Sequence, residues 1–223
     1  MCGRFTLRSA PNLVATEFEL PLLPPYRPRW NIAPTQQVLA VRLHDGKSEA
    51  TMLRWGLIPV WTDDIKKQPL LINAKSEAAA TKPSFRSAFK RRRCLVVADG
   101  YYEWRAIGKK KQPYYHCLIN DRPFAFAGLW ERWEKGEKPV ESCTILTTDA
   151  NSLAAAVHDR MPVILPHSAY KAWLDPEIED AAALQKHLCP YPAAEMTAYP
   201  VNPIVNKAGN EGPECVAAVN VEE

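Results

Sequence analysis

The stretch that decides the fold runs Cys94-Leu95-Val96-Val97-Ala98-Asp99-Gly100-Tyr101-Tyr102-Glu103-Trp104-Arg105. Its first five residues form a continuous apolar run that is typical of a strand, and Asp99-Gly100 is a turn signal. A second strand-like run, Tyr101–Arg105, follows at once, and together with Tyr114–Ile119 it flanks a lysine-rich turn at Gly108. The stretch therefore predicts a strand followed directly by a β-hairpin.

Strand patterns also dominate the rest of the chain. Gln37–Leu43 and Ala50–Trp55 flank His44-Asp45-Gly46-Lys47, which is a hairpin signal. Further predicted strands cover Phe124–Trp130, Cys143–Thr147 and Met161–Leu165. Predicted helices are fewer and cover Leu13–Phe18, Glu77–Thr81, Ala150–Val157, Ser168–Leu174 and Asp180–Leu188, with Asn151 and Ser168 as candidate N-caps. We expect an α+β fold with a mainly antiparallel, barrel-like β core and peripheral helices, because no βαβ alternation indicates a parallel sheet.

Length and composition limit the class of protein. The chain has 223 residues, which fits a single domain over 1–223, and we expect the last ~10 residues to form a flexible tail. No apolar run is long enough to span a bilayer, and no apolar stretch of a signal peptide follows Arg4. We therefore expect no membrane partner and a cytoplasmic location, on the nucleoid in a bacterium or in the nucleus of a eukaryote.

The cysteines and charges say less about partners. The six cysteines show no Cys-x-x-Cys spacing, which disfavours structural zinc and a disulfide framework. Cys94, Cys117 and Cys143 lie in strand-like runs and are expected to be buried as small apolar residues. The net charge is only +3, but Lys90–Arg93 and Lys109–Lys111 are local basic runs. Each run could neutralise phosphates or simply form a solvated surface turn.

Four places carry polar or reactive groups in apolar or aromatic surroundings. Cys2 would combine an α-amine and a thiol on one residue if Met1 were removed. Asn73 follows an apolar run and precedes a predicted helix. Glu103 stands between aromatic residues on a predicted strand, where burial would raise its pKa and let it move protons near neutral pH. His158 lies at a predicted junction of helix and strand.

Each of these residues also has a structural interpretation. Cys2 could be a passive terminal residue, and Asn73 a turn or cap residue. Glu103 could pair with a lysine of Lys109–Lys111 across the hairpin, and His158 could be a structural histidine. No spacing rule connects the four places, so composition and periodicity leave these alternatives open.

Seven motifs in order do connect them. They are Met1-Cys2-Gly3-Arg4-Phe5, Trp30-Asn31-Ile32-Ala33-Pro34, Arg54-Trp55-Gly56-Leu57-Ile58-Pro59, Asn73-Ala74-Lys75-Ser76-Glu77, Ala98–Trp104, Lys111-Gln112-Pro113-Tyr114 and His158-Asp159-Arg160-Met161-Pro162. Together they resemble the SRAP family (SOS-response-associated peptidase) from Met1 to about Gly212. The resemblance implies the SRAP fold.

The resemblance also implies a function in the DNA damage response. Family members form a covalent DNA–protein crosslink at abasic sites in single-stranded DNA, which shields the lesion. Carried over to this sequence, Cys2 would be the crosslinking residue, and Asn73, Glu103 and His158 would complete the active site. The implied DNA contacts are Arg4, Pro34, Trp61, Lys75, Arg93, Trp104, Thr147 and Arg160. Family members often have arginine at the position of Lys75, and a second tryptophan where Thr62 follows Trp61.

The chemistry of the residues fits this function independently of the resemblance. An abasic deoxyribose opens to an aldehyde, and an α-amine with a pKa near ~8 is partly a neutral nucleophile. The amine can form a Schiff base, and the thiol of the same residue can then close a five-membered thiazolidine. Glu103 would move protons, His158 would act as an acid at the sugar oxygen, and Asn73 would orient the amine or the lesion. The chemistry requires no metal or organic cofactor, and a monomer suffices for it.

Two other functions remain open at this stage. In a cysteine peptidase, which could process its own N-terminus, Cys2 would be the nucleophile, His158 the base and Asn73 the orienting group. A non-covalent reader of damaged or modified single-stranded DNA would bind fully without Cys2. Replication-fork proteins are further possible partners of a protein that acts on such DNA.

Overall fold

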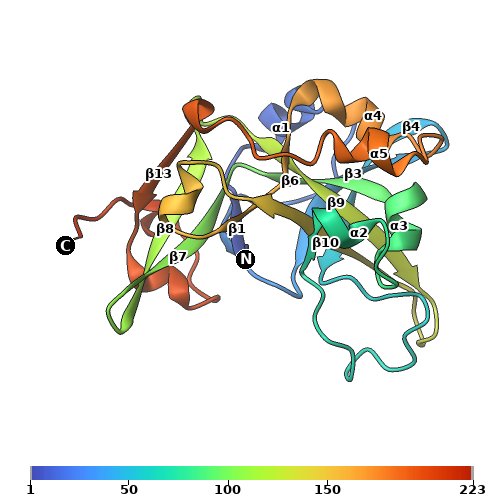
Figure 1. The fold of residues 1–223 in the computed structure, drawn as a ribbon, viewed down its shortest axis with the longest axis horizontal. Helices are drawn as coiled ribbons and strands as arrows, with labels where there is room; N and C mark the ends of the chain where they lie inside the picture. Colours follow the sequence, from blue (N-terminus) through green and yellow to red (C-terminus); the bar gives the residue numbers. More distant parts are fainter. Residues whose placement is uncertain (1, 222–223) are drawn as a thin grey trace.

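The computed structural model describes residues 2–221, and Met1, Glu222 and Glu223 lie outside the described part. Its strands form two sheets (Figure 1). The smaller sheet has the strand order β13–β8–β7–β1–β2, and every pair in it is antiparallel. Its strands are β1 (Arg4–Leu7), β2 (Arg29–Ile32), β7 (Gly100–Ile107), β8 (Lys110–Leu118) and β13 (Met196–Pro200).

The larger sheet closes on itself. β3 pairs with β4 and β6, β9 pairs with β6 and β10, and β10 pairs with β4, so five strands complete a ring. Its strands are β3 (Gln37–His44), β4 (Lys47–Trp55), β5 (Asn73–Lys75), β6 (Arg93–Ala98), β9 (Phe124–Trp133), β10 (Val140–Asp149), β11 (Arg160–Pro162) and β12 (Ile164–Leu165). The ring confirms the predicted barrel-like β core.

Two pairings in this sheet are parallel, although the sequence predicts mainly antiparallel strands. β10 first runs parallel to the end of β4, where Cys143 lies opposite Trp55, and then parallel to β5, where Ile145 lies opposite Asn73. The chain leaves the edge of β10 at Gly56, whose φ of 121° favours glycine, and returns at Asn73. The segment 56–72 between them projects from the barrel (Figure 1).

The helices are short and peripheral, as expected. They are α1 (Pro11–Glu17), α2 (Ser76–Ala79), α3 (Arg86–Arg91), α4 (Tyr170–Leu174) and α5 (Ala181–Gln185), with 3₁₀ turns η1 (Ala154–Ala156), η2 (His167–Ala169), η3 (Ala193–Glu195), η4 (Pro203–Asn206) and η5 (Pro213–Val216). The helix predicted over 150–157 is only the turn η1. Asn151 lies before this turn and not at its N-cap position, although its Oδ1 accepts from Ala154 N at 2.8 Å. Ser168 is not a cap, because the 3₁₀ turn η2 continues into α4.

β1 connects the two sheets. The ring of Phe5 leaves the smaller sheet and packs edge-on against Trp55 and Phe126 of the barrel, at centroid distances of 5.1 and 5.8 Å. All three side chains are fully buried. Buried aromatic side chains remove a large apolar area from water, and their edge-to-face contacts add to this stabilisation. The position of β1 is therefore fixed from both sides.

A buried carboxylate fixes the end of β1. Asp99 lies at the corner between β6 and β7 and is 1% exposed. Its oxygens accept from Thr6 Oγ1 at 2.5 Å and from the backbone N–H groups of Arg8 and Ser9 at 2.5 and 2.7 Å. Arg8 Nε lies 3.3 Å from the same carboxylate. Because a buried charge is stable only when it is well hydrogen-bonded, this corner holds residues 6–9 in one conformation.

The last residues do not form the predicted flexible tail. Cys215 is fully buried, Ala218 forms a bridge with Val201, and Val219 N donates to Pro200 O at 3.0 Å. The apolar Cys215, packed with Val201 and Val205, attaches this end of the chain to the smaller sheet. The prediction is wrong for this part, and residues 222 and 223 lie outside the described range. No helix among residues 2–221 is both long and apolar enough to cross a bilayer.

The burial of His116 predicts that the free energy of unfolding depends on pH. Its ring lies on β8, is 1% exposed and stacks on Tyr101 at 4.7 Å, and burial lowers its pKa from 6.5 to about 4. The unfolded chain therefore binds a proton at higher pH than the folded chain. The contribution of His116 to the free energy of unfolding is therefore fully present above pH ~6.5. It is lost as the pH falls toward ~4, by about 3 kcal/mol in total, because the unfolded chain takes up a proton that the folded chain does not.

Replacing the ring by one that cannot titrate isolates this contribution. In His116→Phe the free energy of unfolding, measured in urea between pH 7 and pH 4, should fall less steeply with acid than in the unchanged protein. Phenylalanine can still stack on Tyr101. An equal slope in the two proteins would show that His116 is not the titrating group.

Candidate functional site

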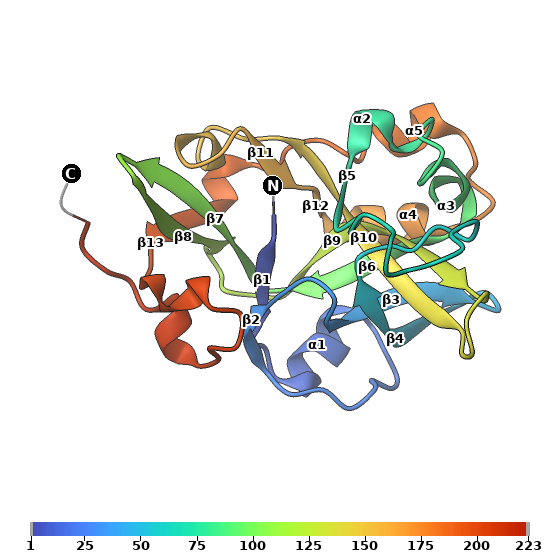
Figure 2. The same ribbon diagram turned by 90° about the horizontal axis from the view of Figure 1, so that it is seen from below.

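Cys2 lies between the two sheets. It lies two residues before the start of β1, which pairs with β7 on one side, and its carbonyl oxygen accepts from Asn73 Nδ2 of β5 at 2.7 Å. Figure 2 shows the start of β1 between β7 and β5. Cys2 is fully buried. A single hydrogen bond thus ties the beginning of the chain to the place where β5 returns to β10.

The environment of Cys2 keeps its thiol protonated. Burial raises the pKa of the thiol far above its usual range, and the charge of Glu103 raises it further. The Sγ atom points toward the carbonyl of Arg4 at 3.7 Å. Since a thiolate is the reactive form of cysteine, this site does not by itself activate the sulfur as a nucleophile.

Glu103 and His158 face a common depression. It has a volume of about 330 Å³ and is lined by Glu103, Trp104, Lys111, His158 and Asn206. Glu103 is 4% exposed, and burial raises the pKa of its carboxyl, while a positive charge on His158 opposes this shift. A carboxyl with a raised pKa can both donate and accept a proton nearer neutral pH.

The alternative partner of Glu103 is not found. Glu103 lies opposite Tyr114 in the hairpin, whereas Lys111 lies opposite Ala106, nearer the turn. Within residues 2–221 no ion pair joins Glu103 to the run Lys109–Lys111. The hairpin therefore presents Glu103 to the depression, which Lys111 also lines, without an ion pair between the two side chains.

The Nδ1 atom of His158 makes two contacts. It lies 3.0 Å from the backbone N of Arg160 and 2.8 Å from a carboxylate oxygen of Asp159. The first contact suits a neutral ring that accepts at Nδ1, and the second suits an imidazolium ring. We give more weight to the first, because Asp159 is 87% exposed and its charge is screened by solvent. In that tautomer Nε2 carries the proton and can donate a hydrogen bond.

A polar network surrounds Asn73. β5 pairs with β10 so that Lys75 lies opposite Thr147, and Arg160 of β11 donates to Thr147 O at 2.7 Å. The guanidinium of Arg160 also binds both oxygens of Glu77, at 2.5 and 2.8 Å, and lowers the pKa of that carboxyl to about 2. Lys75 is exposed.

Three buried polar atoms in this network have no hydrogen-bond partner within residues 2–221. They are Asn73 Oδ1, Thr147 Oγ1 and Arg160 Nε. Buried polar atoms are almost always hydrogen-bonded in folded proteins. These three atoms are therefore candidates for contacts with a bound ligand.

The other predicted DNA contacts come from different parts of the fold. Trp61 is 52% exposed on the projecting segment 56–72, and Trp104 is half-buried at the depression. Pro34 follows β2, whose Ile32 lies opposite Phe5, so it lies near the start of β1. The guanidinium of Arg4 donates to Val205 O at 2.8 Å and to Asn31 Oδ1 at 3.1 Å, which gives it a structural role as well.

Arg93 does not fit its predicted role. Its side chain is 2% exposed, and its guanidinium donates to four backbone carbonyls at the ends of two helices, those of Phe89, Lys90, Trp173 and Asp175. The basic run 90–93 contains the end of α3, which the sequence did not predict, and the chain buries this arginine as a helix cap. The prediction that Arg93 contacts DNA is wrong for this structure.

The structure adds residues that sequence reasoning missed. Glu77 was noticed only as part of a motif, although it binds Arg160 with both oxygens. Asn206 carries no pattern of its own, and only its place at the depression reveals it. Tyr101 is fully buried, and Cys2 and Glu103 both act on the pKa of its hydroxyl, which burial raises. Its position two residues before Glu103 on one strand could have suggested a shared face.

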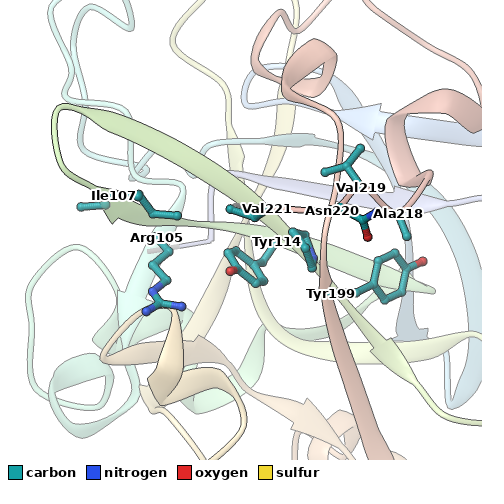
Figure 3. A pocket seen from close by; sticks show the side chains of 10 residues that line it. Arg105, Ile107, Tyr114, Tyr199, Ala218, Val219, Asn220 and Val221 are labelled. Carbon is teal, nitrogen blue, oxygen red and sulfur yellow. The ribbon is translucent and has the colours of Figure 1, made fainter. Parts of the chain in front are cut away.

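A larger cavity lies away from Cys2. It has a volume of about 730 Å³ and lies between the β7–β8 hairpin, β13 and residues 218–221 (Figure 3). Tyr114, Tyr199 and Arg105 line it. None of the residues predicted from the sequence as catalytic lines this cavity, so size alone does not identify the functional site.

Comparison with known proteins identifies the family of this chain. A family model described as "SOS response associated peptidase (SRAP)" matches residues 1–208. The chain belongs to the SRAP family. An SRAP-fold crystal structure from Bacteroides thetaiotaomicron superposes with a TM-score of 0.82 at 27% identity, covering 98% of this chain and all of the other.

Curated relatives give the SRAP family its functional names. The chain is 42% identical to "Abasic site processing protein YoaM" of Bacillus subtilis, over 99% of each chain. It is 35% identical to "Abasic site processing protein HMCES" of Xenopus tropicalis, over 87% of this chain and 67% of the relative. The similarity to these SRAP proteins therefore extends from bacteria to vertebrates.

The contacts of Arg160 predict a loss of stability on truncation. Arg160→Ala removes the hydrogen bonds to Glu77, Asp149 and Thr147 O, so the free energy of unfolding should fall by about 1–3 kcal/mol. Urea unfolding at pH 7 measures this difference. Lys75→Ala, a truncation on the neighbouring exposed position, should change it by less than about 0.5 kcal/mol. Equal effects of the two changes would contradict the structural role of Arg160.

Proposed function

We propose that this protein recognises an abasic site in single-stranded DNA and forms a covalent thiazolidine crosslink with it through Cys2, after Met1 is removed. The observation that carries the proposal is the single junction where Asn73 holds Cys2 beside the buried carboxyl of Glu103. The names of the SRAP relatives support abasic-site DNA as the substrate. The crosslink would shield the lesion during the DNA damage response.

The reaction balances without an added reagent. The α-amine of Cys2 adds to the aldehyde carbon of the ring-opened sugar and gives a carbinolamine. Loss of the hydroxyl as water gives an imine. The Cys2 sulfur then bonds to the imine carbon while its proton moves to the nitrogen, which closes a five-membered ring. The net change is one new C–N bond, one new C–S bond and one released water.

Glu103 can transfer the proton in two of these steps. Because burial raises its pKa, the carboxyl keeps its proton to a higher pH than an exposed glutamate does, and in that form it can protonate the departing hydroxyl. The resulting carboxylate can then take the proton of the Cys2 thiol, whose own pKa is too high for spontaneous ionisation. This division of roles makes the raised thiol pKa compatible with ring closure.

His158 and Asn73 assist in different ways. His158 lines the depression, and its imidazolium form, which the contact of Nδ1 with Asp159 suits, would protonate the sugar ring oxygen and so favour the open aldehyde. Asn73 does not titrate. Its amide nitrogen fixes the carbonyl of Cys2, and its buried Oδ1 would accept from the amine or the lesion.

The strand would be held mainly through backbone and stacking contacts. Lys75 is exposed and can approach a phosphate, and Trp61 and Trp104 offer surfaces for base stacking. Arg4, Pro34, Thr147 and Arg160 lie around the same junction and complete the proposed contacts. Arg160 is already bound to two carboxylates, so we expect it to order this surface more than to neutralise phosphate.

A peptidase is the less favoured alternative. Cysteine peptidases need a thiolate, which a nearby cation or helix N-terminus stabilises. Here burial and Glu103 both raise the thiol pKa. We therefore do not assign cleavage of other proteins to this site, and removal of Met1 requires no such activity from it.

A denaturing gel tests the proposed function. The purified protein, shown by intact mass to begin at Cys2, is incubated with single-stranded DNA that carries one abasic site. We expect a slow-migrating band that survives denaturant. Intact DNA should give none, and Cys2→Ala should give none because the thiol that closes the ring is missing.

The outcomes separate the three functions. A band that persists with Cys2→Ala, or its absence from protein that begins at Cys2, would contradict the thiazolidine. Full DNA binding without any band would favour a non-covalent reader. Cleavage of a protein substrate in a parallel reaction would favour the peptidase.

The proton transfers by Glu103 predict a separate kinetic effect. Glu103→Gln keeps the size of the side chain but cannot exchange a proton, so the crosslinking rate should fall by about 10²-fold or more. In the unchanged protein the crosslinking rate should decline as rising pH removes the Glu103 proton. In Glu103→Gln this decline should be absent. Single-turnover rates from pH 5 to pH 9 measure both effects.

Glu137→Gln is the matched control, since Glu137 is an exposed carboxylate in the turn between β9 and β10. It should crosslink at the unchanged rate. A normal rate for Glu103→Gln would rule out proton transfer by this carboxyl.

A further inference from the structure

The segment Pro203–Glu211 is clamped against β1 and β2 by two side chains. Asn31 Nδ2 lies within 3.0–3.1 Å of the carbonyl oxygens of Val205, Lys207 and Asn210. Arg4 Nη1 donates to the same Val205 oxygen and to Asn31 Oδ1. Both clamping residues come from the first 31 residues of the chain, and the segment comes from the last 21.

The clamped segment is fixed at two further points. At its far end, Glu211 accepts from the backbone N–H groups of Trp30 and Asn31 at 2.8 and 3.2 Å and from Arg29 Nε at 2.5 Å. Near its start, Val205 is fully buried in an apolar cluster with Tyr102 and Cys215. The segment cannot shift without breaking several of these bonds at once.

Asn206 is the residue of the clamped segment that reaches the depression. It lines the depression together with Glu103, Trp104 and His158. Its Oδ1 accepts from Trp104 Nε1 at 2.7 Å. Trp104 follows Glu103 directly on β7, and its ring is half-buried. The clamped segment thus contacts, through Asn206, the indole of Trp104, which is the residue next to Glu103.

We infer that Asn206 is a positioning residue that fixes the indole of Trp104 as a stacking surface for the nucleotide beside the abasic site. The inference rests on the proposed function and assigns part of the substrate site within it. A base stacks well only on a ring that is already held at the right angle. Asn206 supplies that angle, and Arg4 and Asn31 hold Asn206 in place.

This arrangement also explains why Asn206 should affect binding more than chemistry. The side-chain hydrogen bond of Asn206 goes to Trp104, which takes no part in the bond-making steps of the proposed reaction. Loss of that bond would leave the indole free to turn, and binding would then have to order it. The cost should appear in the dissociation constant.

The test measures binding and chemistry separately. Binding is followed by fluorescence anisotropy of single-stranded DNA that carries a tetrahydrofuran abasic analogue, which has no aldehyde and cannot crosslink. Asn206→Ala should weaken this binding about three- to tenfold, the size of one hydrogen bond. The crosslinking rate with a natural abasic site at saturating protein should stay within about twofold.

A double-variant comparison shows whether Asn206 acts through Trp104. In a Trp104→Phe protein, which has no indole N–H, adding Asn206→Ala should weaken binding no further. Asn202→Ala is the control, because Asn202 is an exposed residue that caps the same 3₁₀ turn by accepting from Ile204 N at 2.9 Å. It should leave binding unchanged, and thermal unfolding should show that all variants fold.

Three results would overturn the inference. The first is that Asn206→Ala binds the analogue as tightly as the unchanged protein. The second is that Asn206→Ala weakens binding as much in the Trp104→Phe protein as in the unchanged protein. The third is that Asn206→Ala lowers the crosslinking rate at saturating protein without changing binding. Failure of the proposed function looks different. In that case the unchanged protein would bind the analogue yet form no crosslink with the natural abasic site, and the binding comparison would still decide the role of Asn206.

Discussion

The buried carboxylate of Asp99 is the constraint on which the site depends. It lies where the last barrel strand before the hairpin, β6, turns into β7, and it collects hydrogen bonds from Thr6, Arg8 and Ser9. β1 is therefore attached at one end to the corner of the hairpin. Its other end carries Cys2, so the same interaction sets how far the N-terminal residues extend between the sheets.

Phe5 and Asn73 complete this placement from the barrel side. Phe5 packs into the barrel core, and Asn73 reaches Cys2 from the strand that returns to β10. The smaller sheet contributes the carboxyl of Glu103, and the barrel contributes the amide of Asn73. The site is thus a junction between two sheets, and neither sheet alone contains it.

The sequence predicted the parts of the fold that depend on local chemistry. The hairpin at Asp45-Gly46 was predictable because both residues take positive φ, 48° and 73°, which this pair favours. The parallel pairing of β4 and β5 with β10 was not, because it depends on where the chain returns after the segment 56–72. Arg93 was misread because no local pattern shows that the ends of two helices will surround it.

The candidate site shows the same division. The chemical types of Cys2, Asn73, Glu103 and His158 stood out in the sequence, but their association came from the resemblance to a family and not from spacing. Trp104 was noticed as an aromatic side chain. Its partner Asn206 lies about a hundred residues later in a segment with no pattern, so only the folded chain brings the two together.

The burial of Cys2 has a consequence for the order of events during synthesis. Two of the elements around Cys2 are β5, which ends at Lys75, and β7, which begins at Gly100. A ribosome needs on the order of ten seconds to reach these positions. Throughout that interval neither β5 nor β7 is available to pack around Cys2. Removal of Met1, which the proposed function requires, can then take place on an unfolded chain, before folding buries Cys2.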